Sequence, residues 1–280
     1  MNRRSFVRGL MLGAAGAACL PEPCAGYARK RLSKIGVQLY TVRRELEADF
    51  EGTLAKVAAL GYREVEFAGY YKHTPAQVKA ILARHGLSAP SAHFQSVVSG
   101  GGVREAIEAA AVIGHKYLVY AWLPPEERKS LDDYKRLVER LNRAGEECRR
   151  AGLQFGYHNH DFEFAPVEGR IPYDLILEGT DAQLVKMELD LYWITKGGQS
   201  PLAYFRKHPG RFPLVHVKDM DSTPKHYFTE VGRGRIDFKE IFAASKQAGI
   251  KHYFVEQDET PASPFDSIKT SIDYLKRLEF

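Results

Sequence analysis

Histidines and carboxylates gather at the ends of several apolar runs in the sequence. His158 and His160 lie two residues apart in the run 156–164, which is otherwise rich in aromatic and apolar residues. Residues i and i+2 of a β-strand point to the same face, so these two imidazoles are expected to share one face. Three later runs close on similar side chains, namely Glu188 with Asp190, His216 with Lys218 and Asp219, and Glu256 with Asp258. Because buried polar groups need partners, we interpret the chain as a scaffold that brings these strand ends together.

Asp190, His216 and Glu256 are the predicted metal ligands. They lie at equivalent ends of three consecutive apolar runs, and two carboxylates with one imidazole suit Mn²⁺, Mg²⁺, Fe²⁺, Co²⁺ or Zn²⁺. His158, His160 and Glu163 compete for the place of a fourth ligand. A histidine that is not bound to the metal could orient a substrate hydroxyl or act as a general acid or base. The alternative for any single residue is a core histidine or a salt-bridged carboxylate.

Lys218 and the two tryptophans are further candidates for the site. Lys218 follows His216 by two residues, so both side chains are expected on one face, where the lysine could act as a base or as an oxyanion donor. A salt bridge with Asp219 or Glu188 is the alternative. Trp122 and Trp193 offer faces on which a sugar could stack, although buried packing explains each of them equally well.

Strand-like and helix-like segments alternate along the chain after residue 34. Apolar periodicity and turn residues predict strands and helices in turn. The expected strands are 35–40, 64–67, 88–94, 117–120, the run that carries His158 and His160, 185–191, 212–217 and 253–256. The expected helices are 52–60, 75–86, 103–113, 130–151, 173–179, 200–208, 237–249 and 264–277. Strict alternation indicates a parallel sheet.

Eight such units in about 250 residues are typical of an α/β (β/α)₈ barrel, the TIM barrel. A doubly wound open sheet is the alternative. Polar and aromatic side chains at the carboxyl ends of the strands favour the barrel, because its mouth brings all these ends together. Five of these residues are expected to contact substrate: Gln38, Glu66 and His93, together with Trp122 and Trp193.

Residues 1–28 are predicted to be a Tat signal peptide, and residues 29–280 to form the barrel. Arg3 and Arg4 make a twin-arginine pattern, and a short Ala/Gly-rich apolar run follows from Gly9 to Leu20. We therefore expect a periplasmic protein. The apolar run is too short and too weak for a stable membrane span. Cys148 is the one cysteine left after the leader, so export does not serve an intramolecular disulfide.

The charge distribution argues weakly against nucleic-acid binding. The formal net charge is +5. Residues 1–28 contain three arginines and one glutamate, so the rest of the chain carries +3. The basic residues are interleaved with acids, which is usual for a solvated surface. Gly232-Arg233-Gly234-Arg235 lacks the residues of a phosphate loop and is interpreted as a plain turn. A homodimer is compatible with the sequence.

Six motifs carry a resemblance to a known superfamily over roughly residues 34–280. They are Gly36–Thr41, Gly156–Phe164, Glu188–Trp193, Val215–Asp219, Val231–Gly234 and Val255–Asp258. Together they resemble the xylose isomerase-like TIM-barrel superfamily of sugar phosphate isomerases and epimerases, which is related to endonuclease IV. The resemblance implies a divalent-metal site with Asp190, His216 and Glu256 as ligands.

The resemblance also narrows the expected chemistry. Many members carry a Glu on the fifth strand where this chain has His158, and some carry a His at the place of Trp193. The motifs look closer to the inosose dehydratase branch and to lyases that act on 3-keto-glycosides. All these reactions begin by abstracting a proton α to a carbonyl, and they differ in whether the intermediate is reprotonated or expels a leaving group. We therefore expect a metal-dependent isomerase, epimerase or lyase acting on a sugar or keto-sugar.

Two other classes of function are kept as alternatives. A phosphodiesterase of the endonuclease IV type would bind several metals and DNA, which the modest charge and the export signal oppose. A non-catalytic sugar-binding protein would need no metal.

Overall fold

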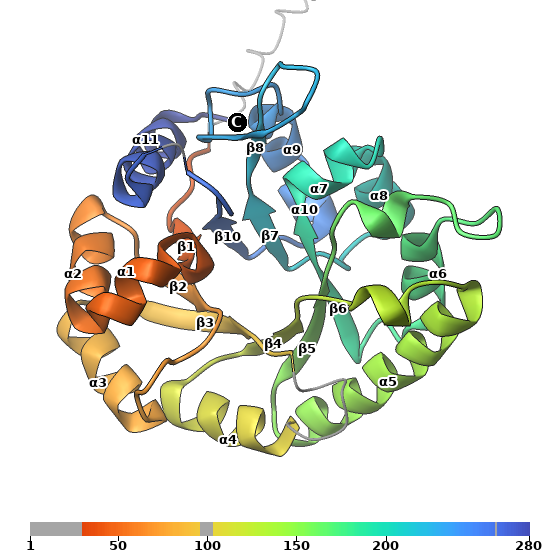
Figure 1. The fold of residues 1–280 in the computed structure, drawn as a ribbon, viewed down its shortest axis with the longest axis horizontal. Coiled ribbons are helices and arrows are strands. Elements are labelled where there is room, and N and C mark those ends of the chain that lie inside the picture. The colour runs from red at the N-terminus through yellow and green to blue at the C-terminus, as the bar shows by residue number, and fades with distance from the viewer. Residues whose placement is uncertain (1–29, 96–102, 261) are drawn as a thin grey trace, which may run out of the picture.

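Eight parallel strands close into a barrel in the computed structural model, which describes residues 30–95, 103–260 and 262–280 (Figure 1). The order around the barrel is β1-β10-β7-β6-β5-β4-β3-β2, and every neighbouring pair is parallel. The strands are β1 (Gly36–Gln38), β2 (Glu64–Phe67), β3 (Ser88–His93), β4 (Tyr117–Tyr120), β5 (Gln154–His158), β6 (Val185–Asp190), β7 (Leu214–Val217) and β10 (His252–Val255). The predicted TIM barrel is confirmed, and the open sheet is excluded. The predicted signal peptide lies outside the described residues.

Helices surround the strands as an outer ring (Figure 1). Seven lie where the periodicity predicts them: α2 (Phe50–Leu60), α3 (Pro75–Arg84), α4 (Val103–Ile113), α5 (Leu131–Arg150), α6 (Pro172–Gly179), α8 (Pro201–Lys207) and α11 (Pro264–Arg277). Capping boxes begin two of them, with Thr74 and Gln77 on α3 and Ser130 and Asp133 on α5. None of the helices in the described residues is long and apolar enough to cross a membrane.

Several short elements of the connections differ from the predictions. The helix predicted over 237–249 is divided into α9 (Phe238–Ala243) and α10 (Ser245–Ala248). Unpredicted elements are the helices α1 (Arg43–Ala48) and α7 (Leu191–Lys196), the 3₁₀ turns η1 (Leu39–Val42), η2 (Pro125–Glu127) and η3 (Phe162–Phe164), and a hairpin of β8 (Asp219–Met220) and β9 (Phe228–Thr229). All follow the carboxyl ends of strands directly or in the connection, where they shape the mouth of the barrel.

In the barrel interior, an apolar layer lies beneath a polar layer at the carboxyl ends of the strands. Side chains two residues apart on a strand share a face, so Leu214 and His216 point inward together, as do Phe254 and Glu256. Leu214 and Phe254 form a small buried cluster with Tyr117 and Val119. The next residues toward the carboxyl ends are polar instead. The strands therefore deliver charged groups to the carboxyl end of a closed barrel, above a layer of apolar side chains. At the amino end, beneath that layer, Glu64 and His252 form an ion pair at 2.8 Å.

A buried histidine outside the barrel interior should make stability depend on pH. His115 is 2% exposed, its Nδ1 lies 2.5 Å from the Ala89 carbonyl oxygen, and its Nε2 lies 2.7 Å from the Tyr70 hydroxyl. A carbonyl oxygen only accepts, so Nδ1 carries the proton and Nε2 accepts from Tyr70. Burial lowers the pKa of His115, against smaller opposing effects of Ala89 and Glu66. The folded state therefore binds fewer protons here than the unfolded state near pH 6.

The neutral, buried His115 contributes to the free energy of unfolding. We expect this contribution to be complete above the pKa of about 6.5 that the histidine has in the unfolded chain, and to be lost as the pH falls below that value. The free energy of unfolding should fall more steeply between pH 7.5 and pH 5 in the wild type than in His115→Asn, by at most about 1.4 kcal/mol per pH unit for one proton. Urea denaturation at several pH values measures both slopes. Equal slopes would contradict this account of His115.

Candidate metal centre and substrate pocket

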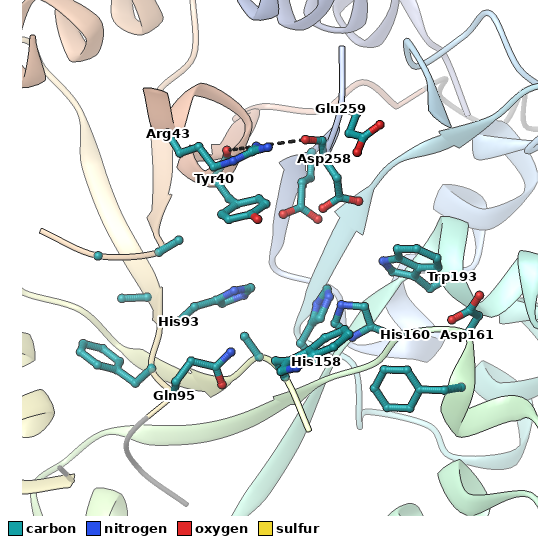
Figure 2. Close-up of a pocket in the computed structure, with 18 of the residues that line it drawn as sticks. Tyr40, Arg43, His93, Gln95, His158, His160, Asp161, Trp193, Asp258 and Glu259 are labelled. Atoms are coloured by element: carbon teal, nitrogen blue, oxygen red, sulfur yellow. Dashed lines mark hydrogen bonds between the residues drawn. The ribbon is translucent and has the colours of Figure 1, made fainter. Parts of the chain in front are cut away.

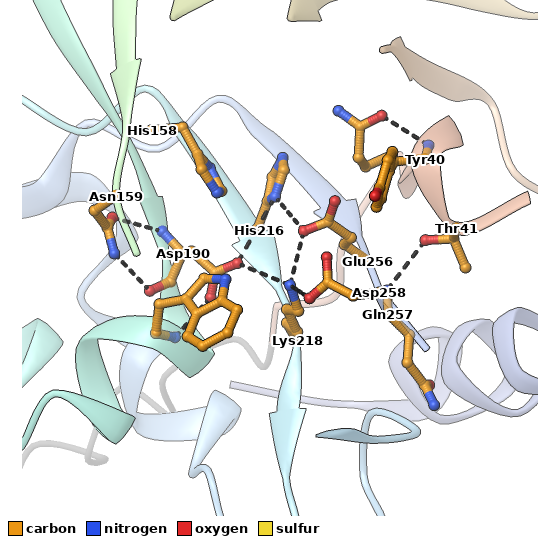
Figure 3. A network of polar contacts seen from close by, with 12 residues as sticks. Tyr40, Thr41, His158, Asn159, Asp190, His216, Lys218, Glu256, Gln257 and Asp258 are labelled. Carbon is orange, nitrogen blue, oxygen red and sulfur yellow. Dashed lines mark hydrogen bonds and ion pairs between the residues drawn. The ribbon is translucent and has the colours of Figure 1, made fainter. Parts of the chain in front are cut away.

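Four buried side chains at the carboxyl ends of neighbouring strands face one point inside the barrel mouth (Figure 3). His158 ends β5, Asp190 ends β6, His216 lies on β7 and Glu256 follows β10. The Nδ1 atom of His216 lies 3.0 Å from Glu256 Oε2 and 3.8 Å from Asp190 Oδ2. One ligand atom from each of the four lies within 4.8 Å of all the others. The structure therefore brings the three predicted ligands together and adds His158.

The donor set of these four residues fits a divalent cation. Asp190 Oδ1 accepts a hydrogen bond from the Trp193 backbone at 2.8 Å and so begins α7, but buried Asp190 Oδ2 has no hydrogen-bond partner among the described residues. Burial raises the pKa of Asp190 to about 7 in spite of nearby Lys218 and His216. A carboxylate that is this poorly solvated is stabilised by a cation. Two carboxylates and two imidazoles are typical ligands of Zn²⁺, Co²⁺, Fe²⁺ or Mn²⁺.

A second layer of charged groups lies beneath His216. Its Nε2 atom lies 2.7 Å from Glu66 Oε2 and 3.2 Å from Glu188 Oε2. His93 reaches the same two carboxylates, at 3.3 Å from Glu66 and 2.6 Å from Glu188. Burial raises the pKa of Glu188, but the effect of the nearby histidines is larger and lowers the pKa to about 2. Glu66 and Glu188 thus bind one side of the His216 ring, which leaves Nδ1 facing Asp190 and Glu256.

Glu188 is a member of this site that the sequence analysis did not assign to it. It can form a second group of ligand-type atoms with His93, His158 and His216, again within 4.8 Å. Two of those residues also belong to the first group. Glu188 precedes Asp190 by two residues. Because residues i and i+2 of a strand share a face, the sequence could have predicted that both point into the barrel.

Lys218 is a buried cation beside the four residues. Its Nζ atom lies 3.0 Å from Glu256 Oε2 and 3.6 Å from Asp190 Oδ2, and it forms an ion pair with Asp258 (Figure 3). Burial alone would lower the pKa of Lys218, but Glu256, Asp258 and Asp190 outweigh it and raise the pKa above its ordinary value. In this arrangement Lys218 is a charged hydrogen-bond donor. The sequence left open a salt bridge of Lys218 with Asp219 or Glu188, but its ion pairs are with Asp190, Glu256 and Asp258 instead.

A pocket of about 1110 Å³ opens above the four residues (Figure 2). Its lining includes His158, His160 and Glu256 at the floor and the rings of Tyr40, Tyr70, Phe94, Trp122, Phe162, Trp193 and Phe228 around them. His93, Trp122 and Trp193, which we predicted to contact substrate, line it. Gln38 and Glu66 do not. They lie buried beneath the floor, where Gln38 donates to Glu66 at 2.8 Å.

His160 does not lie on the strand where periodicity placed it, and Glu163 does not lie at the candidate metal ligands. β5 ends at His158, so His160 lies in the following turn rather than on the strand. Its ring still faces the pocket. The centre of the ring lies 5.0 Å from that of His158 and 5.3 Å from that of Phe162, on which it stacks. The structure does not bring Glu163 to the four-residue group. Its carboxylate accepts from the Tyr157 hydroxyl at 2.6 Å and from the His160 backbone at 2.8 Å, and these bonds hold the turn in η3.

Asp219 holds the loop after the β8–β9 hairpin and does not enter the pocket. Its carboxylate accepts backbone hydrogen bonds from Met220, Gly232, Gly234 and Ile236 at 2.8, 2.9, 3.0 and 3.2 Å. Gly232 has a φ of +88°, and a Cβ on Gly234 would lie 2.2 Å from the Asp219 carboxylate. The Gly-Arg-Gly turn is thus the backbone cradle of one buried aspartate.

Asp219→Asn should therefore destabilise the fold. One carboxylate oxygen becomes an NH₂ group that cannot accept, so two backbone donors lose their partner at a cost of about 1–3 kcal/mol. Urea denaturation measures the change. Asp221→Asn is the matched control, because Asp221 accepts from the Thr223 and Tyr227 backbones at 3.1 and 3.0 Å in a more exposed loop. Equal losses in the two variants would show that Asp219 has no special role.

Comparison with known proteins agrees with this arrangement. A family model described as xylose isomerase-like TIM barrel matches residues 54–278. The chain belongs to this family. That confirms the resemblance drawn from the motifs of the sequence.

Enzymes are among the proteins to which the chain is similar. The chain is 26% identical over 270 residues to an inosose dehydratase of Lacticaseibacillus casei, covering 82% of this chain and 89% of the relative. A sugar phosphate isomerase/epimerase from Parabacteroides distasonis superposes with a TM-score of 0.78 and 29% identity over 88% of this chain and 98% of that one. An IolI protein with a bound zinc atom has the same fold, with a TM-score of 0.70, 16% identity and coverage of 86% and 95%. The chain is an enzyme of this family.

Proposed function

We propose that the chain is a divalent-metal-dependent enzyme that removes a proton from the carbon next to the carbonyl group of a keto-sugar and then expels a group β to that carbonyl. The observation that carries this proposal is one cluster of two carboxylates and two imidazoles at the floor of a large pocket, with an unpaired histidine beside it. Similarity to an inosose dehydratase supports elimination over plain isomerisation.

The four residues His158, Asp190, His216 and Glu256 would hold the metal. When bound, a divalent cation supplies a Lewis acid that polarises a carbonyl oxygen and stabilises the charge that develops on it. The second imidazole in place of a carboxylate favours Zn²⁺, Co²⁺ or Fe²⁺ over Mg²⁺, since nitrogen ligands suit these ions better.

His160 is the side chain we assign to proton transfer. Its Nδ1 atom is buried and has no hydrogen-bond partner within the described part of the chain. Burial, together with the charge of Lys218, lowers the pKa of His160 to about 3, so the ring is neutral and has a free lone pair at neutral pH. Stacking on Phe162 and an edge contact with Trp122 at 4.7 Å hold the ring in the pocket wall. A neutral, fixed imidazole can accept a proton from a substrate carbon.

Two other groups support the site in this proposal, Lys218 from beneath the pocket and Trp193 from its wall. Lys218 keeps its proton and places a positive charge beside Glu256. Trp193 lines the pocket, and its indole Nε1–H is buried without an acceptor among the residues described. A buried donor that faces a pocket is satisfied by a ligand oxygen, and a sugar hydroxyl supplies one.

The test is a comparison of oxidised and native sugars with metal-loaded protein. Keto-sugars and 3-keto-glycosides should be turned over to an enone-type product that absorbs in the ultraviolet. The corresponding sugars without the ketone should be inert, and a chelator should stop the reaction. Equal turnover of the sugars that lack a ketone would refute the proposal.

A further inference from the structure

Arg128 is the cation in the pocket wall that the proposed chemistry does not use. It follows η2 in the connection after β4 and lines the pocket. Its guanidinium carbon lies 3.3 Å from the centre of the Phe162 ring and 4.9 Å from that of Trp122. Both rings also contact His160. Arg128 therefore stands beside the proton-transfer residue, on the side of the pocket formed by the connections after β4 and β5.

The guanidinium of Arg128 has no hydrogen-bond or ion-pair partner within residues 30–95, 103–260 and 262–280. Its Nη1 atom is buried, and the structure shows no hydrogen bond or ion pair to its guanidinium. Two acidic residues near it already have partners, Glu127 with Arg140 and Asp161 with Lys196. A buried charged donor without an acceptor is unfavourable, so a native structure that retains one commonly meets a ligand there.

The other cations around the pocket differ from Arg128 in this respect. Arg43 donates to the backbone oxygens of Tyr40 and Asp258 at 2.8 and 3.0 Å (Figure 2). Lys218 pairs with three carboxylates. Of these three cations, Arg128 is the one whose whole guanidinium is without a hydrogen bond or ion pair in the described residues, so its full fork of N–H groups can meet a ligand. That planar fork matches the geometry of a carboxylate or a phosphate.

The size of the pocket leaves room for such a group. Ligand pockets are commonly about 300–1,000 Å³, and this one measures about 1110 Å³. A single sugar ring at the metal centre would leave the side toward Trp122 and Phe162 open. Trp122 is 37% exposed and presents an aromatic face there.

We propose that Arg128 forms an oxyanion subsite, and that the substrate carries a carboxylate or phosphate group which Arg128 binds while its carbonyl end lies at the metal centre. The assignment of the two ends rests on the proposed function. The subsite itself rests on the unpaired arginine and the open pocket, so binding can test it without turnover.

The experiment measures binding of D-glucose, D-glucuronate and D-glucose 6-phosphate to the metal-loaded full chain by isothermal titration. At least one of the two acidic sugars should bind about ten-fold or more tightly than glucose. Arg128→Gln should remove this advantage, and Arg128→Lys, which keeps the charge but loses the fork, should keep part of it. The acid that loses more affinity in Arg128→Gln identifies the group as carboxylate or phosphate.

Lys129→Gln is the matched control, because it removes the same charge from the exposed neighbouring position. It should keep the preference for the acidic sugar. Metal content and thermal melting of each variant show whether the metal centre and the fold are intact. Where they are intact, any binding of the acidic group to the metal itself is the same in all variants, and differences between variants report on Arg128. The subsite is overturned if neither acid binds more tightly than glucose, or if Arg128→Gln keeps the preference. An Arg128-dependent preference without any turnover of keto-sugars would leave the subsite standing and remove the proposed reaction.

Discussion

Asp190→Asn should release the metal and abolish turnover while leaving the barrel folded. The asparagine can still accept the Trp193 backbone hydrogen bond that begins α7, so the local structure is retained. It replaces Oδ2, the buried oxygen that accepts no hydrogen bond from the described residues, by an NH₂ group that cannot bind a cation. Loss of a partner outside the ligand shell lowers metal affinity by roughly 10–100-fold, and loss of a ligand should cost more than that.

Metal analysis of the purified variant and titration of the metal-free protein with Zn²⁺ measure the affinity. Asp237→Asn is the matched control, since Asp237 caps α9 through the same kind of bond, to the Glu240 backbone at 3.0 Å, on an exposed surface. That control should bind the metal like the wild type. If Asp190→Asn also keeps a stoichiometric metal with unchanged affinity, the centre does not lie where we place it.

His160→Gln should separate proton transfer from metal binding. His160 is the pocket histidine that lies outside both groups of ligand-type atoms. Its replacement should lower kcat about 10²–10⁴-fold, the usual contribution of a positioned acid or base, and leave the metal content unchanged. Rates with a keto-sugar substrate and metal analysis of the same sample provide the two measurements.

His208→Gln is the control for this substitution. His208 also has a buried, unpaired ring nitrogen and stacks on an aromatic ring, Tyr204, but it follows α8 and does not line the pocket. Its turnover should equal that of the wild type. A loss of metal in His160→Gln would make His160 a ligand, and an unchanged kcat would remove it from the reaction.

Strand periodicity explains which parts of the site the sequence could predict. Asp190, His216 and Glu256 meet because they end neighbouring parallel strands, and a closed barrel brings such ends to one mouth. His160 was expected at the pocket for a strand-based reason that does not hold, since β5 ends two residues earlier. Its ring reaches the pocket because the turn held by Glu163 directs it there.

The remaining features depend on tertiary contacts that periodicity does not encode. Glu163 looked like a ligand because of its type and position, but its nearest donors are the Tyr157 hydroxyl and a backbone amide. Arg128 lies in an irregular connection, and only the folded chain shows that Phe162 comes from the next connection to stack beneath it. Loop residues of this kind commonly decide substrate choice on barrel enzymes.

The most direct test of the proposed reaction follows the fate of one proton. Metal-loaded protein is incubated with a keto-sugar in D₂O, and in parallel in water labelled with ¹⁸O, and the recovered sugar and products are analysed by NMR and mass spectrometry. We expect deuterium on the carbon next to the carbonyl, or an elimination product that has lost that hydrogen, with no ¹⁸O introduced by bond cleavage. Cleavage of a glycoside or phosphodiester bond with ¹⁸O incorporated and no carbon-bound deuterium would contradict it.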